Sequence, residues 1–252
     1  MLDAIALSDI HLGSDHCEAK ALTRLLDEIV SGTVQVRRLI LNGDVFDSCD
    51  FRRLKRSHWR VLSRLRTLSD QIEILWIRGN HDGPAELFSH VLGVAVQDEY
   101  ILKSGGKRIL FHHGHRFDDF IDDHPIVTAL ADAFYKFLQR VDNTHQIARL
   151  AKRSSKTFLR CSQKIESRSL ELAASQACEI VCCGHTHLAS THTDGCFSYW
   201  NSGCWTEKPC HYLTVNNGVV ALHAYEHPQH EDVGRAAANW EHHSSRMVSP
   251  AS

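Results

Sequence analysis

The stretch Ala4-Ile5-Ala6-Leu7-Ser8-Asp9-Ile10-His11 places two metal-ligating side chains just after a run of four apolar residues. A short apolar run of this kind, bounded by polar residues, is typical of a buried strand. Asp9 and His11 are two residues apart, so a regular extended chain would direct both side chains to the same side. We therefore expect a buried strand that delivers a carboxylate and an imidazole to one point at its carboxyl end.

Strand and helix patterns alternate outward from this start. Short apolar runs at 39–41 and 72–77 indicate two further strands, and apolar residues recur at helical spacing over 21–29 and 54–68. This series predicts a largely parallel sheet with helices packed on it. The loops that follow such strands meet at one edge of the sheet, which is where ligands bind in folds of this kind.

The pattern changes after Val94. Short strands with tight connections are expected at 109–111, 180–182, 197–200, 212–215 and 219–224. Asn217-Gly218, between the last two, is a strong hairpin signal. We therefore predict a second sheet, richer in antiparallel pairs, that packs on the first.

A helical insertion is expected from about residue 118 to 177, where strand signals are missing. Its second helix should run from about Thr144 to Ala174 and carry a basic face, formed by Arg149, Arg153, Lys156, Arg160, Lys164 and Arg168. This face is a solvated surface or a cap that binds a diphosphate or a lipid headgroup, with Phe134, Phe137 or Phe158 meeting an acyl chain. A nucleic-acid groove is the remaining alternative, and the overall charge argues against it. We expect one domain over 1–226, including the insertion, and a flexible histidine-containing tail over 227–252.

Bulk properties narrow the location and the partners. The net charge of −2 gives no global attraction to polyanions, so nucleic acid is not an expected partner. No signal-peptide pattern and no apolar stretch of membrane-spanning length are present. The nine cysteines include no C-x-x-C pair, which favours reduced thiols over a disulfide framework. We expect a cytoplasmic protein, with peripheral contact at the inner face of a membrane as an alternative, and leave the oligomeric state open.

Four more motifs supply metal-ligand side chains in the same order along the chain. They are Gly43-Asp44-x-x-Asp47, Gly79-Asn80-His81-Asp82, His113-Gly114-His115 and Gly184-His185-x-His187. Each motif alone is weak evidence, but most of them follow an apolar run and should lie at a strand end. Oxygen and imidazole ligands together suit Mn, Fe, Zn or Co. The five motifs therefore predict a metal centre, with enough ligands for two ions.

A charge count favours a phosphate substrate. Two divalent ions would bring four positive charges, and Asp9 and Asp44 would offset two, which leaves roughly +2 at the site. A single carboxylate can bridge two ions, and Asp44 is our candidate. Paired ions can also activate a water molecule for attack on phosphorus.

Two histidines need separate roles. His81 is a candidate to donate a proton to the leaving group or to stabilise the transition state, and the carboxylate of Asp47 is the expected partner that orients it. The role of His115 is left open. It could line the substrate pocket or contact a metal ligand, lie on the plain surface, or bind a metal ion directly.

The five motifs together resemble the calcineurin-like metallophosphoesterases across roughly residues 1–225. That resemblance implies an α/β (α+β) fold, a four-layer αββα sandwich with a helical insertion. It further implies that one ion is bound by Asp9, His11, Asp44 and His187, and the other by Asp44, Asn80, His113 and His185. His81 would match the catalytic histidine of the family, with Asp47 as its partner.

A narrower resemblance is to the UDP-2,3-diacylglucosamine hydrolases and their paralogues. Residues 8–13 (Ser-Asp-Ile-His-Leu-Gly), the insertion and residues 201–207 (Asn-Ser-Gly-Cys-Trp-Thr-Glu) are similar to that group. Those enzymes cleave a pyrophosphate to release UMP and a lipid phosphate in lipid A synthesis, generally with Mn, which is therefore the expected metal. They often carry Arg where this chain has His81, and His-Gly-Asp where it has His113-Gly114-His115.

These departures leave the substrate open. A nucleotide-linked lipid or another phosphate-containing small molecule is the first expectation. The alternatives are a paralogue that acts on a nucleotide, nucleic acid or phosphoprotein, and a non-catalytic scaffold with the same fold.

Overall fold

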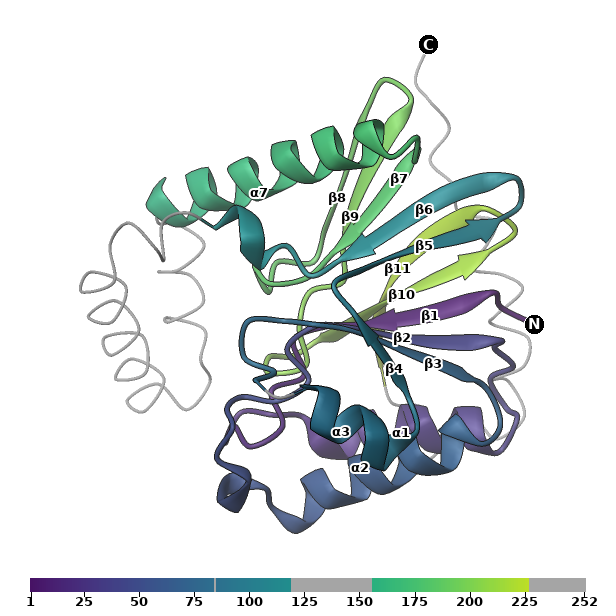
Figure 1. Ribbon diagram of the computed structural model, residues 1–252, viewed down its shortest axis with the longest axis vertical. Helices are drawn as coiled ribbons and strands as arrows, with labels where there is room; N and C mark the ends of the chain where they lie inside the picture. The colour runs from purple at the N-terminus through teal and green to yellow at the C-terminus, as the bar shows by residue number, and fades with distance from the viewer. Residues whose placement is uncertain (84, 119–155, 227–252) are drawn as a thin grey trace.

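The computed structural model describes residues 1–83, 85–118 and 156–226, and two sheets packed face to face form its centre (Figure 1). The first sheet contains, in spatial order, β11 (Val219–Tyr225), β10 (Cys210–Asn216), β1 (Ala4–Leu7), β2 (Arg38–Asn42), β3 (Glu73–Ile77) and β4 (Ala95–Gln97). The second contains β5 (Glu99–Ser104), β6 (Lys107–His112), β7 (Ile180–Cys183), β9 (Phe197–Asn201) and β8 (Ser190–Asp194).

Helices cover the outer face of each sheet. The first sheet is covered by α1 (Ala19–Val30), α2 (Arg56–Ser69) and α3 (Ala85–Leu92), and the second by α7 (Lys156–Ser175) (Figure 1). Two short 3-10 turns, η1 (Phe51–Arg53) and η2 (His115–Phe117), follow β2 and β6. This is the four-layer αββα sandwich that the family resemblance implied.

Alternating side chains hold the four layers together. In β1, Ile5 and Leu7 pack toward the helices, whereas Ala4 and Ala6 pack toward the second sheet. In β6, Phe111 contacts the first sheet and Leu110 lies in the cluster shared with α7. Both faces of the central strands are thus buried, which explains why they appear in the sequence as continuous apolar runs rather than alternating ones.

The hairpin at Asn217-Gly218 is present, but its assignment to the second sheet was wrong. β10 pairs antiparallel with β1 of the first sheet, with Ala4 opposite Val215 and Ala6 opposite Leu213. Pairing with β1 buries the side chains of Leu213 and Val215 in the core between the two sheets, which explains why β10 joins the first sheet. The second sheet is in turn parallel at its centre, and it is antiparallel only in the pairs β5–β6 and β8–β9.

Some predictions on the insertion lie outside the described residues. These are the first helical stripe, Phe134, Phe137, Arg149, Arg153, the side chain of Lys156 and the tail over 227–252. The described part of the long predicted helix is α7, which buries Ala173 against Leu110 and Val181 of the second sheet. All nine cysteines are free thiols, as predicted. In the part of the chain that the structure describes, no helix is both long and apolar enough to span a membrane.

Candidate metal centre

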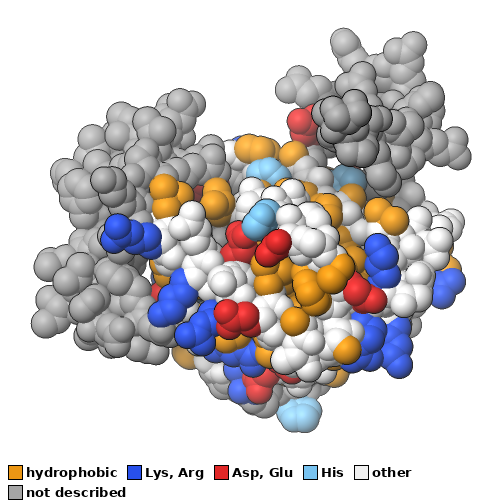
Figure 2. Space-filling view, turned by 90° about the horizontal axis from the view of Figure 1, so that it is seen from above, with side chains coloured by type: hydrophobic (Ala, Val, Ile, Leu, Met, Phe, Trp, Pro, Cys, Tyr) orange, Lys and Arg blue, Asp and Glu red, His pale blue; other side chains and the backbone are white. Residues whose placement is uncertain are grey.

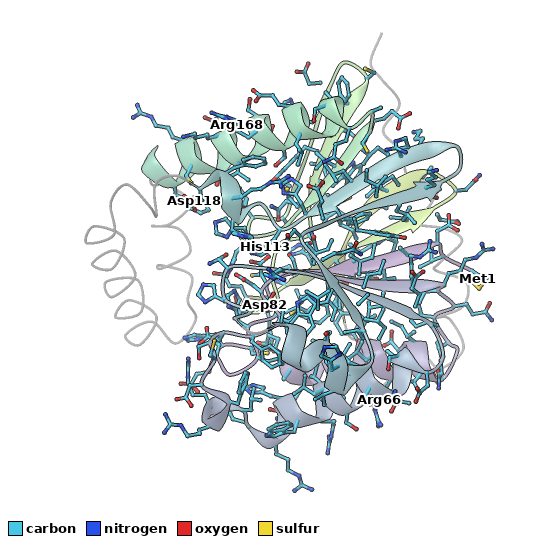
Figure 3. The ribbon with its side chains drawn as sticks, in the orientation of Figure 1. Met1, Arg66, Asp82, His113, Asp118 and Arg168 are labelled. Carbon is cyan, nitrogen blue, oxygen red and sulfur yellow. The ribbon has the colours of Figure 1, made fainter. Side chains whose placement is uncertain are left out.

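All the predicted ligands lie just after strands, at one edge of the sandwich. Asp9 and His11 follow β1, Asp44 follows β2, Asn80 follows β3, His113 follows β6, and His185 and His187 follow β7. Figure 3 shows two labelled residues of these loops, His113 and Asp82, at this edge, while Met1 lies at the opposite edge. The topology therefore gathers motifs from both sheets, as expected for loops at the carboxyl ends of neighbouring strands.

The backbone at these positions is strained. Seven non-glycine residues in the described chain have a positive φ, and five of them are predicted ligands: Asp9 (53°), His11 (51°), Asp44 (53°), His185 (67°) and His187 (60°). Such a conformation costs on the order of 1–2 kcal/mol per residue. It is retained here because backbone bonds fix the loops to each other, for example from Ile10 N to Asp44 O (2.9 Å). Strain of this kind collects where function requires a particular geometry.

Four of the ligand side chains lie close together. His187 Nε2 lies 3.2 Å from Asp9 Oδ1 and 3.2 Å from His11 Nε2, and His11 Nε2 lies 3.7 Å from Asp44 Oδ2. Ligand atoms about 2.0–2.1 Å from a tetrahedral ion are about 3.4 Å from each other. The spacing fits one divalent ion.

A second group shares Asp44. His113 Nε2 lies 3.3 Å from Asp44 Oδ2, and it is buried with no hydrogen-bond partner. The other ring nitrogen, Nδ1, donates to the backbone oxygen of Asn42 (2.8 Å), which directs Nε2 into the centre. Asp44, His113 and His185 each place a ligand atom within 4.8 Å of the others. The residues therefore fit two ions, with Asp44 between them.

Asn80 completes the predicted set. It is exposed, and its position is fixed by its neighbours in the chain. Gly79 N donates to Asp82 Oδ2 (2.8 Å) and His81 N to Asp44 Oδ1 (2.9 Å). The loop therefore stays against Asp44 on both sides of Asn80.

The electrostatics of the centre favour a cation. Burial alone would raise the pKa of Asp9 and of Asp44. His187 beside Asp9 and His113 beside Asp44 have the opposite effect, and the net result is a pKa below the usual range for both carboxyls. Burial and His187 lower the pKa of His11 to about 4, which leaves that imidazole neutral near pH 7. Burial would also lower the pKa of His113, yet Asp44 outweighs it and raises the value to about 9. The two ionised carboxylates thus draw positive charge to the centre.

The contact between His81 and Asp47 differs from the one predicted. His81 is exposed, and its Nδ1 lies 2.9 Å from the backbone oxygen of Asp47, not from the carboxylate. The carboxylate instead binds Arg53 and lies 3.6 Å from His11 Nδ1. Because the carbonyl oxygen can only accept, His81 Nδ1 carries the proton and Nε2 remains for proton transfer.

Asp82 has a role that sequence reasoning missed. Its buried carboxylate accepts hydrogen bonds from four backbone groups in the ligand loops and from a side chain of β3: Asp44 N, Val45 N, Phe46 N, Gly79 N and Trp76 Nε1. Burial, then the nearby Asp44 charge, raises the pKa of Asp82. Its place in the motif after Asn80-His81 was the available signal, but the sequence did not show what it would bind.

Asp118 was also missed. Its Oδ2 lies 2.9 Å from His185 Nε2, and its Oδ1 accepts a bond from Cys161 Sγ on α7 (3.1 Å). Figure 3 shows Asp118 at the same edge as His113. No motif in the sequence pointed to Asp118, because its partners are 43 and 67 residues away.

The predicted substrate contacts are only partly described. His115 is half-buried, with its ring centroid 5.5 Å from that of His113, and burial, then His113, lowers its pKa to about 4. Arg160 and Lys164 are exposed on α7. On the α7 side of the molecule, basic and acidic side chains are interspersed over the described surface (Figure 2).

The segment 201–207 supports the ligand loops. Asn201 Nδ2 donates to Gly184 O (2.8 Å) and to Thr186 Oγ1 (3.1 Å), beside the two histidines of that loop. Trp205 N donates to Asp9 O (3.0 Å). This segment therefore helps to hold the loops of the centre in place.

Comparison with known proteins agrees with this geometry. The family model described as calcineurin-like phosphoesterase matches residues 4–189. No curated protein sequence matches the chain. Among solved structures, the phosphoesterase Yfce from E. coli has a TM-score of 0.50 at 18% identity, covering 88% of this chain and 93% of its own.

Two other structures are similar over comparable lengths. A single mutant of Vps29 from Entamoeba histolytica has a TM-score of 0.46 at 16% identity, over 88% of this chain and 97% of its own. A predicted phosphoesterase from Streptococcus pneumoniae has a TM-score of 0.42 at 17% identity, with the same coverage. At 18% identity, the similarity to Yfce supports the fold alone.

Proposed function

This chain belongs to the calcineurin-like phosphoesterase family, and we propose that it is a dinuclear-metal hydrolase of a phosphate ester or pyrophosphate. The observation that carries the proposal is the position of Asp44 Oδ2, 3.7 Å from His11 Nε2 and 3.3 Å from His113 Nε2. Asp44 thus joins the ligand group of Asp9, His11 and His187 to that of His113 and His185.

Two divalent ions held by these residues would offset the negative charge of a phosphoryl group and acidify water. The protein itself contributes orientation. Asp82 fixes the loop of Asp44, and Asp44 accepts from His81 N, so the ligand and the proposed acid share one rigid support.

His81 is the proposed proton donor to the leaving group. Its Nδ1–H is held by the Asp47 carbonyl, and the side chain is exposed to an incoming substrate. A positioned histidine can donate a proton or stabilise charge as the leaving oxygen departs.

The finer proposal concerns the substrate. A nucleotide-linked lipid, UDP-2,3-diacylglucosamine, would be cleaved to UMP and a lipid phosphate, with Mn as the metal. The resemblance over 8–13 and 201–207 supports this substrate, and so do the exposed Arg160 and Lys164, which could bind a diphosphate. A cytoplasmic location, with peripheral contact at a membrane surface, belongs to the same proposal.

The test is turnover by purified, Mn-loaded protein of UDP-2,3-diacylglucosamine and of a generic aryl phosphodiester, with Asp44→Ala as the control. Release of UMP by the wild type alone supports both levels of the proposal. Hydrolysis of the aryl ester without UMP release supports the metallophosphoesterase chemistry and rejects the lipid substrate. If protein that binds two ions hydrolyses neither compound, the result favours a non-catalytic scaffold or a substrate of another kind.

A further inference from the structure

Asp118 connects a predicted ligand to the helix that covers the second sheet. Its two oxygens are both engaged, Oδ2 with His185 Nε2 at 2.9 Å and Oδ1 with Cys161 Sγ at 3.1 Å. The side chains of His185 and Asp118 are largely buried, at 8% and 11% exposure. This is a sheltered carboxylate–imidazole contact and not a surface ion pair.

The two ring nitrogens of His185 have different partners. An imidazole that donates through Nε2 to a carboxylate keeps Nδ1 as its lone-pair nitrogen. His185 also places one ligand atom within 4.8 Å of ligand atoms on Asp44 and His113. With Nε2 directed to Asp118, Nδ1 is the nitrogen that remains for that group.

We infer that Asp118 is a positioning residue, which fixes the ring orientation and tautomer of His185 so that Nδ1 serves the ion shared with Asp44 and His113. The inference rests on the proposed function. A carboxylate behind a ligating imidazole also makes the ring a stronger donor, and removing such a partner typically weakens metal affinity by about 10–100-fold.

The backbone of His185 does not fix the ring by itself. His185 N is held by both oxygens of Asp9, at 2.9 and 3.1 Å, which fixes the main chain. Beyond Cβ, the ring lies edge-on to His113, with centroids 5.3 Å apart, and 6.4 Å from His115. Among these contacts, only Asp118 accepts a bond from a ring nitrogen, so it selects the tautomer.

The test uses Co²⁺ as the probe, because its visible spectrum reports the ligands of the ion. Metal-free wild type, Asp118→Ala, Asp118→Asn, His185→Ala and the double variant Asp118→Ala/His185→Ala are titrated, with ion content measured independently. Cys161→Ala is the matched control, since it removes a second partner of Asp118 and leaves the contact with His185.

Asp118→Ala is expected to weaken one of the two ions by about 10–100-fold and to change its spectrum. Asp118→Asn, which keeps an accepting oxygen, should lose less metal affinity. The metal affinity of Cys161→Ala should stay within about threefold of the wild-type value. If Asp118 acts through His185, adding Asp118→Ala to His185→Ala should cause little further loss.

Wild-type affinity for both ions in Asp118→Ala would overturn the inference, and so would fully additive losses in the double variant. If Asp118→Ala does not fold, unchanged affinity and spectrum in Asp118→Asn would overturn it equally. Failure of the proposed function gives a different result, in which wild type binds two ions and Asp118 affects them, but no phosphoester is hydrolysed.

Discussion

His81 donates its backbone N–H to Asp44 and its Nδ1–H to the Asp47 carbonyl, which leaves Nε2 for proton transfer. Replacing His81 by Ala should reduce turnover by about 10²–10⁴-fold, because a positioned proton donor contributes that much. Both ions should be retained, since Asp44 and the remaining ligands are unchanged. The measurement is kcat beside metal content. Wild-type-like turnover would remove His81 from the mechanism.

Asp47→Asn separates two accounts of how His81 is oriented. The structure has the backbone oxygen of Asp47 as the acceptor from His81, and the variant keeps that oxygen. Turnover should therefore fall much less than in His81→Ala. An equal loss would restore the carboxylate to the role that the sequence assigned to it.

Single residues show how far the sequence could reach into the site. The ligand types and their order were readable, because each follows a recognisable strand. Whether His81 meets the carboxylate or the carbonyl of Asp47 depends on the path of the backbone, which residue types do not specify. Asp118 was unpredictable for a related reason, since its contact with His185 exists only after the second sheet has assembled.

At the scale of the elements, the loops after β2 and β3 pack too closely for a side chain at Gly79. A Cβ there would lie 2.2 Å from Asp44 N and 2.2 Å from Asp44 Oδ1. Gly79→Ala should therefore displace Asp44, lower the free energy of unfolding by about 1–3 kcal/mol and weaken the binding of both ions. Elemental analysis and urea unfolding measure the two effects.

The matched control for this substitution is Gly195→Ala. Gly195 has a positive φ of 59° and no atom within 4 Å of its Cβ position, so only the cost of the backbone conformation should appear there. Two fully bound ions in Gly79→Ala would show that the loop can adapt.

His58 on α2 connects the β1 loop to the helical layer, and it should give part of the pH dependence of stability. It is buried, and its Nδ1 accepts from Gly13 N and Lys55 N, both at 3.2 Å, which requires the neutral ring. Burial, then Lys55, lowers the pKa of His58. As the pH falls, His58 therefore binds a proton in the unfolded chain before it does so in the folded chain. The contribution of His58 to stability is complete above about pH 6.5 and decreases as the pH falls below that value.

His58→Asn, which keeps an accepting oxygen, should lose less stability than the wild type between pH 7.5 and 5.5. Urea unfolding of both proteins at the two pH values gives the difference, in which the titration of all other groups cancels. Identical pH slopes would exclude this role for His58.

Across the whole molecule, the αββα order brings ligands from both sheets to one edge. The central strands were predictable because apolar runs reveal strands buried on both faces. The edge strand β8 was not, because Ser190–Asp194 is mostly exposed and polar. The hairpin of β10 and β11 was found from Asn217-Gly218, but a local turn signal does not say which sheet edge it will join.

This arrangement predicts that bound metal stabilises the entire fold. Asp9, His11, Asp44 and Asn80 come from loops of the first sheet, and His113, His185 and His187 from loops of the second. Ions shared between these loops would link the two sheets, in addition to the apolar core between them and hydrogen bonds such as that from His113 Nδ1 to Asn42 O. Binding to the folded state alone, at a free ion concentration about 1,000 times Kd, adds about 4 kcal/mol.

Thermal unfolding with and without a chelator measures this contribution. For a chain of this size the expected decrease in Tm on chelation is roughly 8–16 °C, and added metal should reverse it. Asp44→Ala, which lacks the residue common to both ligand groups, should show a much smaller metal-dependent change. Equal Tm values for the wild type in both conditions would mean that the ions do not join the sheets, and that each ligand group is held in place by the protein alone.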